Sequence, residues 1–158
     1  MISKDYKRSN ILIGWSVFLI AAVTYLLTLE PTVSFWDCGE FIAASYRLQV
    51  GHPPGAPLFI LIARIFTFFA GNNPQNVAKM VNALSGLASA FTILFLFWTI
   101  THLVKRYVRR NGEPSLNEKL IIFGSGALGS LAYTFSDTFW FSAVEGEVYA
   151  LSSLFTAV

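Results

Sequence analysis

The most constraining feature of the sequence is an uncharged apolar run near its start. Residues 11–29, ILIGWSVFLIAAVTYLLTL, contain no charged side chain over 19 positions. A helix needs about 20 predominantly apolar residues to cross the hydrocarbon core of a bilayer, so this run is long enough to span one. The apolar core of a signal peptide is shorter and is followed by a small-residue cleavage site, whereas LEPTVSFWD follows here. We therefore predict a retained transmembrane helix.

The composition agrees with a membrane environment. Charged residues make up 13% of the chain and hydrophobic types 54%, whereas a soluble domain carries roughly 25% charged residues. The sequence has no basic patch interleaved with aromatic residues, which argues against nucleic acid as a partner. Cys38 is the only cysteine, so neither an intrachain disulfide nor a cysteine-based metal site can form.

Further apolar segments predict an all-α, polytopic transmembrane fragment. The apolar run after Glu147 covers about 11 residues, which is too few for a span. We therefore interpret residues 1–158 as the N-terminal part of a longer transmembrane domain and expect this part to be inactive alone. The predicted elements are helix one (11–29), a large external loop (30–76), helix two (77–104), a cytoplasmic loop (105–119), helix three (120–135), an external turn (136–147) and the start of helix four (148–158).

Within the external loop the sequence predicts two short juxtamembrane helices separated by a rigid turn. Ser34 can cap a helix that runs through FWDCGEF and IAASYRLQV to Gly51. GHPPGAP follows, and its three prolines in five residues fix an extended turn. The next segment, LFILIARIFTFFAG, is short for a span and is expected to lie in the membrane interface or to re-enter it. Asn73 and Pro74 then predict the N-cap and first position of helix two.

Small residues predict close helix contacts in the membrane. GSGALG at residues 124–129 matches the GxGxxG pattern of dinucleotide-binding loops, but that pattern requires a preceding strand, and here an apolar helix surrounds it. We therefore interpret these glycines as helix-packing positions and reject nucleotide binding. Ser115 and Glu118 match a capping box at the start of helix three. Four small residues of helix two form a second packing stripe: Ser85, Gly86, Ser89 and Ala90.

Charge is distributed unevenly between the two ends of the predicted helices. If three helices alternate in direction, the amino terminus and the loop 105–119 lie on one side, and both are rich in Lys and Arg, including Arg109 and Arg110. The positive-inside rule makes that side cytoplasmic. We therefore expect chemistry on the opposite, outer side. Six of the nine acidic residues lie there: Glu30, Asp37, Glu40, Asp137, Glu145 and Glu147.

Two acidic pairs on the outer side each allow two interpretations. Asp37 and Glu40 lie three residues apart and share one helix face; Asp37 either completes a capping box with Ser34 or, with Glu40, belongs to a catalytic site that needs a general base. Glu145 and Glu147 are either a solvated loop at a helix N-terminus or a second wall of the same site. In the second case, like-charge repulsion would raise the pKa of at least one carboxyl group.

Two cationic side chains of the loop are also open to two interpretations. His52 in the proline turn either holds a phosphate or substrate or belongs to a rigid surface loop. Arg64 either pairs with an anion at a polar cavity or extends to lipid headgroups. The only other histidine, His102, is expected near the opposite face, so we predict no metal site.

The run from SFWDCGEF through GHPPGAPLFILIARIFTFFAG to NALSGLASAFTILFLFW resembles the integral-membrane glycosyltransferases of the GT-C superfamily, in particular the protein O-mannosyltransferases. It is similar to a bacterial family known as a domain of unknown function and related to a eukaryotic transmembrane O-mannosyltransferase. The likeness lies in the acidic first external loop, in the HPP turn with its short helix, and in a spanning helix that opens at Asn82. SDTFWFSAVEGEVYAL resembles the family's external turn between helices three and four.

The resemblance implies a transferase that needs neither metal nor cofactor. The donor would be a sugar, such as mannose, on a polyprenyl-phosphate carrier, transferred with inversion to an acceptor hydroxyl, such as a protein Ser or Thr, outside the bacterial inner (cytoplasmic) membrane. An external-loop carboxylate would take the hydroxyl proton; we assign this role to Asp37, with Glu40 organising the substrates. A phosphate leaving group favours a nearby cation; Arg64 is the first candidate for this role and His52 the second. The residues assigned to substrate binding are His52, Arg64, Glu145 and Glu147.

The expected partners follow from this chemistry. They are membrane lipid, the polyprenyl-phosphate sugar and a protein acceptor, without nucleic acid. The alternative function is a non-enzymatic membrane scaffold or a transporter subunit. In that case the outer carboxylates solvate a surface or bind a partner protein.

Overall fold

The described part of the chain folds only into helices, as the sequence predicts. The computed structural model describes residues 4–53, 55–71, 73–108 and 114–158. Pro54 of the predicted turn and Arg109 and Arg110 of the predicted basic loop lie outside the described residues. The elements are α1 (Lys4–Leu27), α2 (Cys38–Arg47), α3 (Pro57–Thr67), the 3₁₀ turn η1 (Phe68–Ala70), α4 (Asn76–Val108), α5 (Leu116–Thr134), α6 (Asp137–Val144) and α7 (Val148–Ala157).

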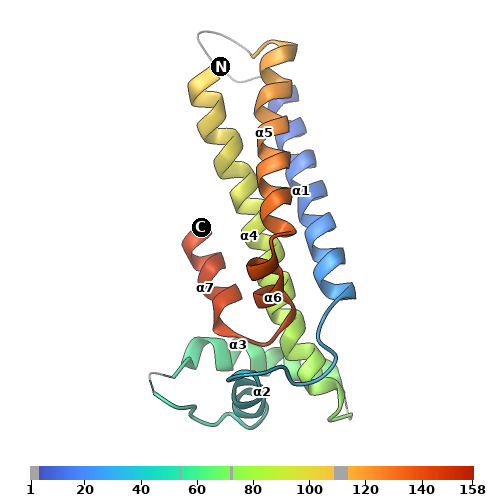
Figure 1. Ribbon diagram of the computed structural model, residues 1–158, viewed down its shortest axis with the longest axis vertical. Helices are drawn as coiled ribbons and strands as arrows, with labels where there is room; N and C mark the ends of the chain where they lie inside the picture. Colours follow the sequence, from blue (N-terminus) through green and yellow to red (C-terminus); the bar gives the residue numbers. More distant parts are fainter. Residues whose placement is uncertain (1–3, 54, 72, 109–113) are drawn as a thin grey trace.

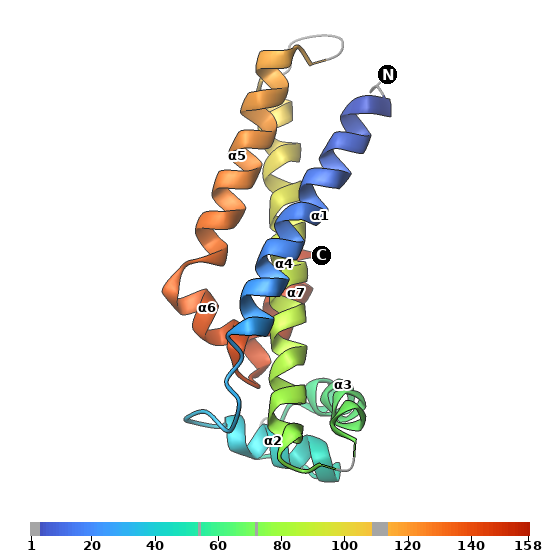
Figure 2. The same ribbon diagram turned by 90° about the vertical axis from the view of Figure 1, so that its right-hand side faces the viewer.

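Three long helices lie side by side, and α4 is the central one (Figures 1 and 2). Of the described helices, α1 and α4 are long and apolar enough to cross a membrane. They contain 24 and 33 residues, which at a rise of 1.5 Å per residue gives about 36 and 50 Å, more than the hydrocarbon thickness of about 30 Å. α5 is shorter and carries Glu118 and Lys119, so its crossing of the membrane stays a prediction.

The first helix begins earlier and ends earlier than the apolar run predicts. α1 starts at Lys4 because the polar residues before Ile11 are themselves good helix formers, and Asp5 lies in the first turn, where the helix dipole favours an anion. It ends at Leu27. Pro31 follows shortly and biases the preceding residue away from helical geometry.

The starts of α4 and α5 differ in how well local sequence predicted them. Asn73 does not cap α4; its Oδ1 accepts a hydrogen bond from the Gln75 N–H at 3.0 Å, which closes a turn, and the helix begins only at Asn76. The predicted capping box of α5 is confirmed. The Ser115 N–H donates to Glu118 Oε2 at 2.6 Å, and the Glu118 N–H donates to Ser115 Oγ at 3.3 Å.

The predicted separation of basic and acidic segments is present in the bundle. The amino-terminal end of α1 lies at the same end of the bundle as the last turns of α4 and the first turns of α5, opposite α2 and α3 (Figure 1). The Lys105 ammonium lies 4.4 Å from the centre of the Tyr6 ring and so joins the start of α1 to the last turns of α4. Which end faces the cytoplasm stays a prediction.

Glycines of α5 allow close contact with α4. A Cβ on Gly126 would lie 2.6 Å from Thr101 Cγ2, and one on Gly129 would lie 2.8 Å from Ile100 Cδ1. The predicted packing role is therefore confirmed for these two glycines. It is wrong for Gly124, which has no atom within 4 Å of an added Cβ. The small residues predicted at helix contacts of α4 are all buried: Ser85, Gly86, Ser89 and Ala90.

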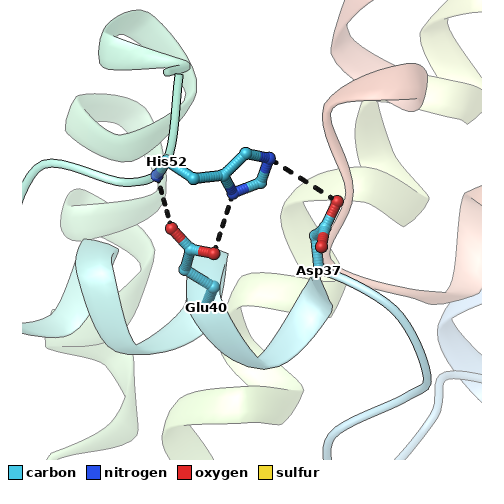
Figure 3. A group of neighbouring side chains, drawn as sticks. All are labelled: Asp37, Glu40 and His52. Atoms are coloured by element: carbon cyan, nitrogen blue, oxygen red, sulfur yellow. Dashed lines mark hydrogen bonds and ion pairs between the residues drawn. The ribbon is translucent and has the colours of Figure 1, made fainter. Parts of the chain in front are cut away.

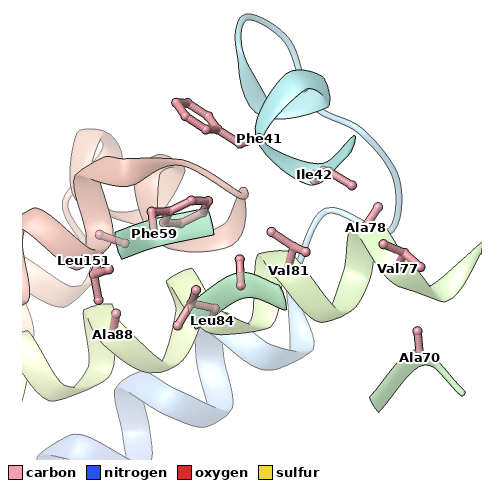
Figure 4. Packing of buried hydrophobic residues seen from close by; sticks show 12 residues of the cluster. Phe41, Ile42, Phe59, Ala70, Val77, Ala78, Val81, Leu84, Ala88 and Leu151 are labelled. Carbon is pink, nitrogen blue, oxygen red and sulfur yellow. The ribbon is translucent and has the colours of Figure 1, made fainter. Parts of the chain in front are cut away.

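The lower end of the bundle is held by an apolar cluster that joins α2, α3 and α7 to α4 (Figure 4). The Phe41 ring of α2 packs edge-on against the Phe59 ring of α3, with centroids 5.5 Å apart. Leu151 of α7 belongs to the same cluster, as do Val81 and Leu84 of α4. This packing brings the start of α2 next to the start of α7, although the two lie more than 100 residues apart in sequence.

The segment 136–147, predicted as an external turn, contains the short helix α6. Ser136 lies at its N-cap position with extended backbone, and its carbonyl accepts the Trp140 N–H at 2.9 Å. Extended geometry at Glu145 and Glu147 ends α6 and precedes α7, which confirms the predicted start of a fourth helix at 148.

Candidate active site

The start of α2 is determined by a sharp turn of the backbone at Trp36. This residue has φ of 61°, in the left-handed region that non-glycine residues rarely adopt. α2 therefore begins at Cys38, with Asp37 at the N-cap position and without a capping bond from its side chain. The Ser34 hydroxyl donates instead to Glu145 Oε2 at 2.5 Å. The predicted capping box of Ser34 and Asp37 is therefore wrong, and the Asp37 carboxylate has no capping role.

The end of α2 also differs from the prediction. Leu48 adopts left-handed backbone geometry, with φ of 53°, and closes the helix after Arg47. The expected end at Gly51 is therefore too late. The early end lets residues 48–52 turn back along α2, so that His52 returns beside Glu40.

Asp37, Glu40 and His52 form one group on the surface of α2 (Figure 3). The His52 backbone N–H donates to Glu40 Oε1 at 2.6 Å, and His52 Nδ1 lies 2.8 Å from Glu40 Oε2. An ionised carboxylate only accepts, so Nδ1 carries the proton in this bond. His52 Nε2 faces the other carboxylate, 3.8 Å from Asp37 Oδ2. The imidazole therefore bridges the two carboxylates that the sequence singled out.

The contacts between His52 and Glu40 favour the charged form of both groups. The hydrogen bonds from the His52 side chain and backbone lower the pKa of the Glu40 carboxyl. The hydrogen bond to Glu40, and then the charges of Glu40 and Asp37, raise the pKa of the imidazole. Glu40 is therefore held as an ionised, doubly engaged acceptor, which makes it a weaker proton acceptor than an unengaged carboxylate.

These three residues also offer the atoms of a potential metal site. One ligand atom from each can be chosen so that all lie within 4.8 Å of one another. No metal site was predicted because the two histidines of the sequence are expected far apart. A mixed site of carboxylates and one histidine was not considered. In the present arrangement both imidazole nitrogens face carboxylates, and the charged form of His52 would supply the positive charge that a bound cation would otherwise supply.

The second acidic pair lies against α4. Gly146 packs so closely that an added Cβ would lie 2.9 Å from Asn82 Oδ1. The Asn82 amide donates to the backbone carbonyls of Glu30 and Thr32 at 2.8 and 3.2 Å. Asn82 therefore lies between residues 30–32 and the Glu145–Glu147 segment and contacts both.

Burial changes the ionisation of groups beside this pair. Glu147 has 6% of its surface exposed, and burial, with a smaller contribution from the charges of Asp37 and Glu145, raises the pKa of its carboxyl. The predicted pKa increase in this pair is therefore present, although burial outweighs like-charge repulsion. The Cys38 thiol donates to Glu147 Oε1 at 3.5 Å, and burial together with both glutamates raises the pKa of the thiol. Cys38 is therefore held as a neutral thiol and is not a nucleophile.

Two hollows meet at Asp37. One, the acidic–aromatic hollow, has a volume of about 560 Å³; the other, the histidine hollow, has about 410 Å³. Asp37, Glu147 and Tyr149 line both. The acidic–aromatic hollow is also lined by Trp36, Asp137, Phe141 and Glu145. The histidine hollow is also lined by Phe41, His52, Gly55 and Ser152.

Arg64 lies apart from this group. Its guanidinium donates to the Tyr46 carbonyl at the end of α2 and to Thr67 Oγ1 at 3.3 Å, and it lies 4.7 Å from the centre of the Phe68 ring. Within the described part of the chain it has no carboxylate at ion-pair distance. The structure therefore brings together Asp37, Glu40, His52, Glu145 and Glu147, and it places Arg64 at the opposite end of α2.

Several residues of the site were assigned no site role from the sequence, among them Asp137, which lines the acidic–aromatic hollow. Trp36 and Tyr149 line the hollows, and Asn82 supports the Glu145–Glu147 segment. The sequence does not mark Trp36 and Tyr149 as site residues, because exposed aromatic residues also form interfacial belts in membrane proteins. Asn82 did give one, because an amide side chain in an otherwise apolar helix needs a hydrogen-bonding partner.

Comparison with known proteins gives a consistent result. Residues 37–158 match the family model described as the protein O-mannosyl-transferase TMEM260 N-terminal domain. The chain is 28% identical over 155 residues to the protein O-mannosyl-transferase tmem260 of Dictyostelium discoideum, covering 98% of this chain and 17% of that protein. It is 33% identical over 144 residues to the protein O-mannosyl-transferase TMEM260 of Mus musculus, covering 90% of this chain and 18% of that protein. No solved structure matches.

These matches define how much of the relatives the chain represents. It spans less than a fifth of the length of each of these two relatives, and the family match begins at Asp37 and includes every predicted site residue. The resemblance to O-mannosyltransferases is thereby confirmed, and the chain belongs to the family of the protein O-mannosyl-transferase TMEM260 N-terminal domain.

Proposed function

We propose that the chain is the N-terminal part of a membrane glycosyltransferase of GT-C type, in which Asp37 is the general base. The enzyme moves a sugar, with mannose as the first candidate, from a polyprenyl-phosphate carrier to a protein Ser or Thr hydroxyl. The relatives are protein O-mannosyl-transferases by name, and this supports the reaction class. The observation that carries the proposal is the position of Asp37 in the wall shared by both hollows.

Asp37 is a better base than Glu40 for geometric reasons. Both Glu40 oxygens accept hydrogen bonds from His52, at 2.6 and 2.8 Å. Asp37 Oδ2 has only the longer contact of 3.8 Å to His52 Nε2, and its side chain is 56% exposed. A base must come within about 2.6–3.2 Å of the hydroxyl whose proton it takes. Asp37 offers oxygens with no hydrogen bond closer than this contact, whereas each Glu40 oxygen already accepts one from His52, which makes Glu40 the weaker proton acceptor.

Glu40 acts in this scheme by positioning His52. It fixes the imidazole through Nδ1 and favours its protonated form. The protonated ring then presents Nε2 to the histidine hollow, where it can bind the phosphate of the leaving carrier. Since the imidazolium supplies the positive charge there, the proposed reaction uses neither metal nor cofactor. Inversion at the sugar is proposed from the resemblance to the family, and it requires the acceptor hydroxyl to attack from the face opposite the departing phosphate.

The membrane arrangement is part of the proposal. The basic end of the bundle faces the cytoplasm and the end that carries α2 and α3 faces outward, following the positive-inside rule. The two apolar helices α1 and α4 support a membrane location. We keep the bacterial inner membrane as the proposed location.

The experiment uses the full-length protein in bilayer nanodiscs. It is given radiolabelled polyprenyl-phosphate mannose and a Ser/Thr-containing peptide, and the product is analysed for mass and anomeric configuration. We expect inverted glycosyl-peptide from the wild type and none above background from the Asp37→Asn, Glu40→Gln double variant. The scaffold function would be supported instead by two results together. The folded wild-type protein transfers neither mannose nor another lipid-linked sugar, and it forms a stable protein complex that the double variant does not form.

A further inference from the structure

The two hollows that meet at Asp37 differ in their charged side chains. The acidic–aromatic hollow is lined by four carboxylates, of Asp37, Asp137, Glu145 and Glu147, and by none of the described Lys, Arg or His side chains. The histidine hollow adds His52 to the two shared carboxylates and contains neither Asp137 nor Glu145. A site that transfers a group between two substrates needs one compartment for each, with the base at their junction. Asp37 is at that junction.

Charge decides which substrate each hollow accepts. A phosphate-linked donor carries negative charge, and unit charges a few ångströms apart at a protein surface repel appreciably. The four carboxylates would therefore exclude the donor phosphate from the acidic–aromatic hollow. The His52 imidazole lowers that repulsion in the histidine hollow. The acidic–aromatic hollow is thereby left for the acceptor.

The aromatic rings of the same hollow narrow the class of acceptor. Trp36 is 92% exposed, Tyr149 62% and Phe141 55%, and all three line the hollow. Exposed aromatic faces beside carboxylates are the combination that binds Lys and Arg side chains, through cation–π contact together with ion pairing. An acidic segment would be repelled, and a neutral segment would use only the rings.

We propose that the acidic–aromatic hollow binds the acceptor and selects protein segments that carry Lys or Arg next to the accepting Ser or Thr. The assignment of one hollow to the acceptor rests on the proposed transferase function. The charge selectivity rests on the lining itself. It makes Asp137, which lines only the acidic–aromatic hollow of the two, a specificity-determining residue rather than a catalytic one.

The experiment measures binding separately from transfer. Fluorescently labelled Ser-containing peptides, flanked by two Lys or by two Glu, are titrated into the full-length protein without donor, and anisotropy gives the two dissociation constants. We expect the Lys peptide to bind roughly ten-fold more tightly at low salt, with the ratio shrinking as ionic strength rises. Asp137→Asn should reduce the ratio about three-fold. Asp5→Asn, which removes the same charge from the first turn of α1, should leave it unchanged.

Other outcomes separate this inference from the proposed function. Equal binding of the two peptides, or an unchanged ratio in Asp137→Asn, would overturn the inference, even if the enzyme transfers mannose normally. Charge-selective binding that depends on Asp137, in a protein that transfers no sugar, would support the inference about the lining and overturn the transferase. When both activities are present, the Lys:Glu ratio of kcat/KM for transfer should follow the ratio of the binding constants.

Discussion

Gly146→Ala tests how the site depends on close packing against α4. A Cβ at this position would lie 2.9 Å from Asn82 Oδ1 and 3.1 Å from Val81 Cγ1, whereas ordinary contacts begin at 3.4 Å. The segment must therefore move away from α4 by about half an ångström, at a cost of about 1–3 kcal/mol for overpacking. Asn82 cannot yield easily, because its amide donates to two backbone carbonyls.

The displacement should affect catalysis as well as stability. Glu145 and Glu147 flank Gly146 and line the hollows, and a misplacement of about 1 Å at a catalytic site can cost about 100-fold in rate. We therefore expect a roughly ten-fold lower kcat and a lower melting temperature for Gly146→Ala in the full-length protein. Gly124→Ala is the matched control, since its added Cβ meets nothing within 4 Å; a helical Gly→Ala change there should stabilise by about 0.5–1 kcal/mol. Equal stability and equal rate in the two variants would refute the packing argument.

Three further predictions concern the ionisation, metal independence and membrane contact of the site. The pKa of His52, read by NMR from the resonances that are missing in His52→Gln, should exceed 6.5 and should fall toward 6.5 in Glu40→Gln. Because the folded pKa is raised, the stability contributed by His52 is fully present below about pH 6.5 and is lost as pH rises through the raised value. On the acid side, the stability contributed by Glu40 is lost as pH falls through its lowered pKa. An unchanged His52 pKa in Glu40→Gln would contradict the assigned hydrogen bond. Transfer should persist in excess EDTA, and a loss that Mn²⁺ or Mg²⁺ restores would contradict the metal-free reaction, with the Asp37, Glu40 and His52 group as the first site to test for metal binding. A spin label at Leu61, on the exposed apolar face of α3, should be accessible to lipid-dissolved oxygen at a shallow depth in nanodiscs, and full accessibility to an aqueous relaxation agent would place α3 in water instead.

The helices that were predicted correctly are those whose sequence patterns lie within the helix itself. The apolar run 11–29 predicted α1, and Ser115 with Glu118 predicted the first turn of α5, because both signals lie within one turn or one helix. Helix boundaries were predicted wrongly where polar residues continue a helix, as they do in α1 before Ile11. α6 was missed because eight residues between Ser136 and Glu145 carry too little periodicity to distinguish a short helix from a turn.

The site depended on contacts that no local pattern contains. The start of α2 was predicted at Ser34, yet the Ser34 hydroxyl bonds Glu145, 111 residues away in sequence, and Trp36 takes left-handed geometry in between. The choice between a capping and a catalytic role for Asp37 could therefore not be made from the sequence alone. Charge sidedness predicted that Glu145 and Glu147 lie on the same side as Asp37, but it left open whether they belong to the same site. Arg64, which was chosen for its charge alone, bonds the Tyr46 carbonyl at the other end of α2.

The most direct test of the role of Asp37 is a single-turnover comparison of Asp37→Asn with Glu40→Gln. Full-length protein is saturated with polyprenyl-phosphate mannose, mixed with excess peptide acceptor and quenched over time, and donor binding is measured in parallel. Removal of a general base typically costs about 10²–10⁴-fold in rate. We predict such a loss for Asp37→Asn with donor affinity unchanged, and a smaller loss with weakened donor binding for Glu40→Gln, because Glu40 acts through His52. Near-normal transfer by Asp37→Asn, together with complete loss in Glu40→Gln, would contradict the account.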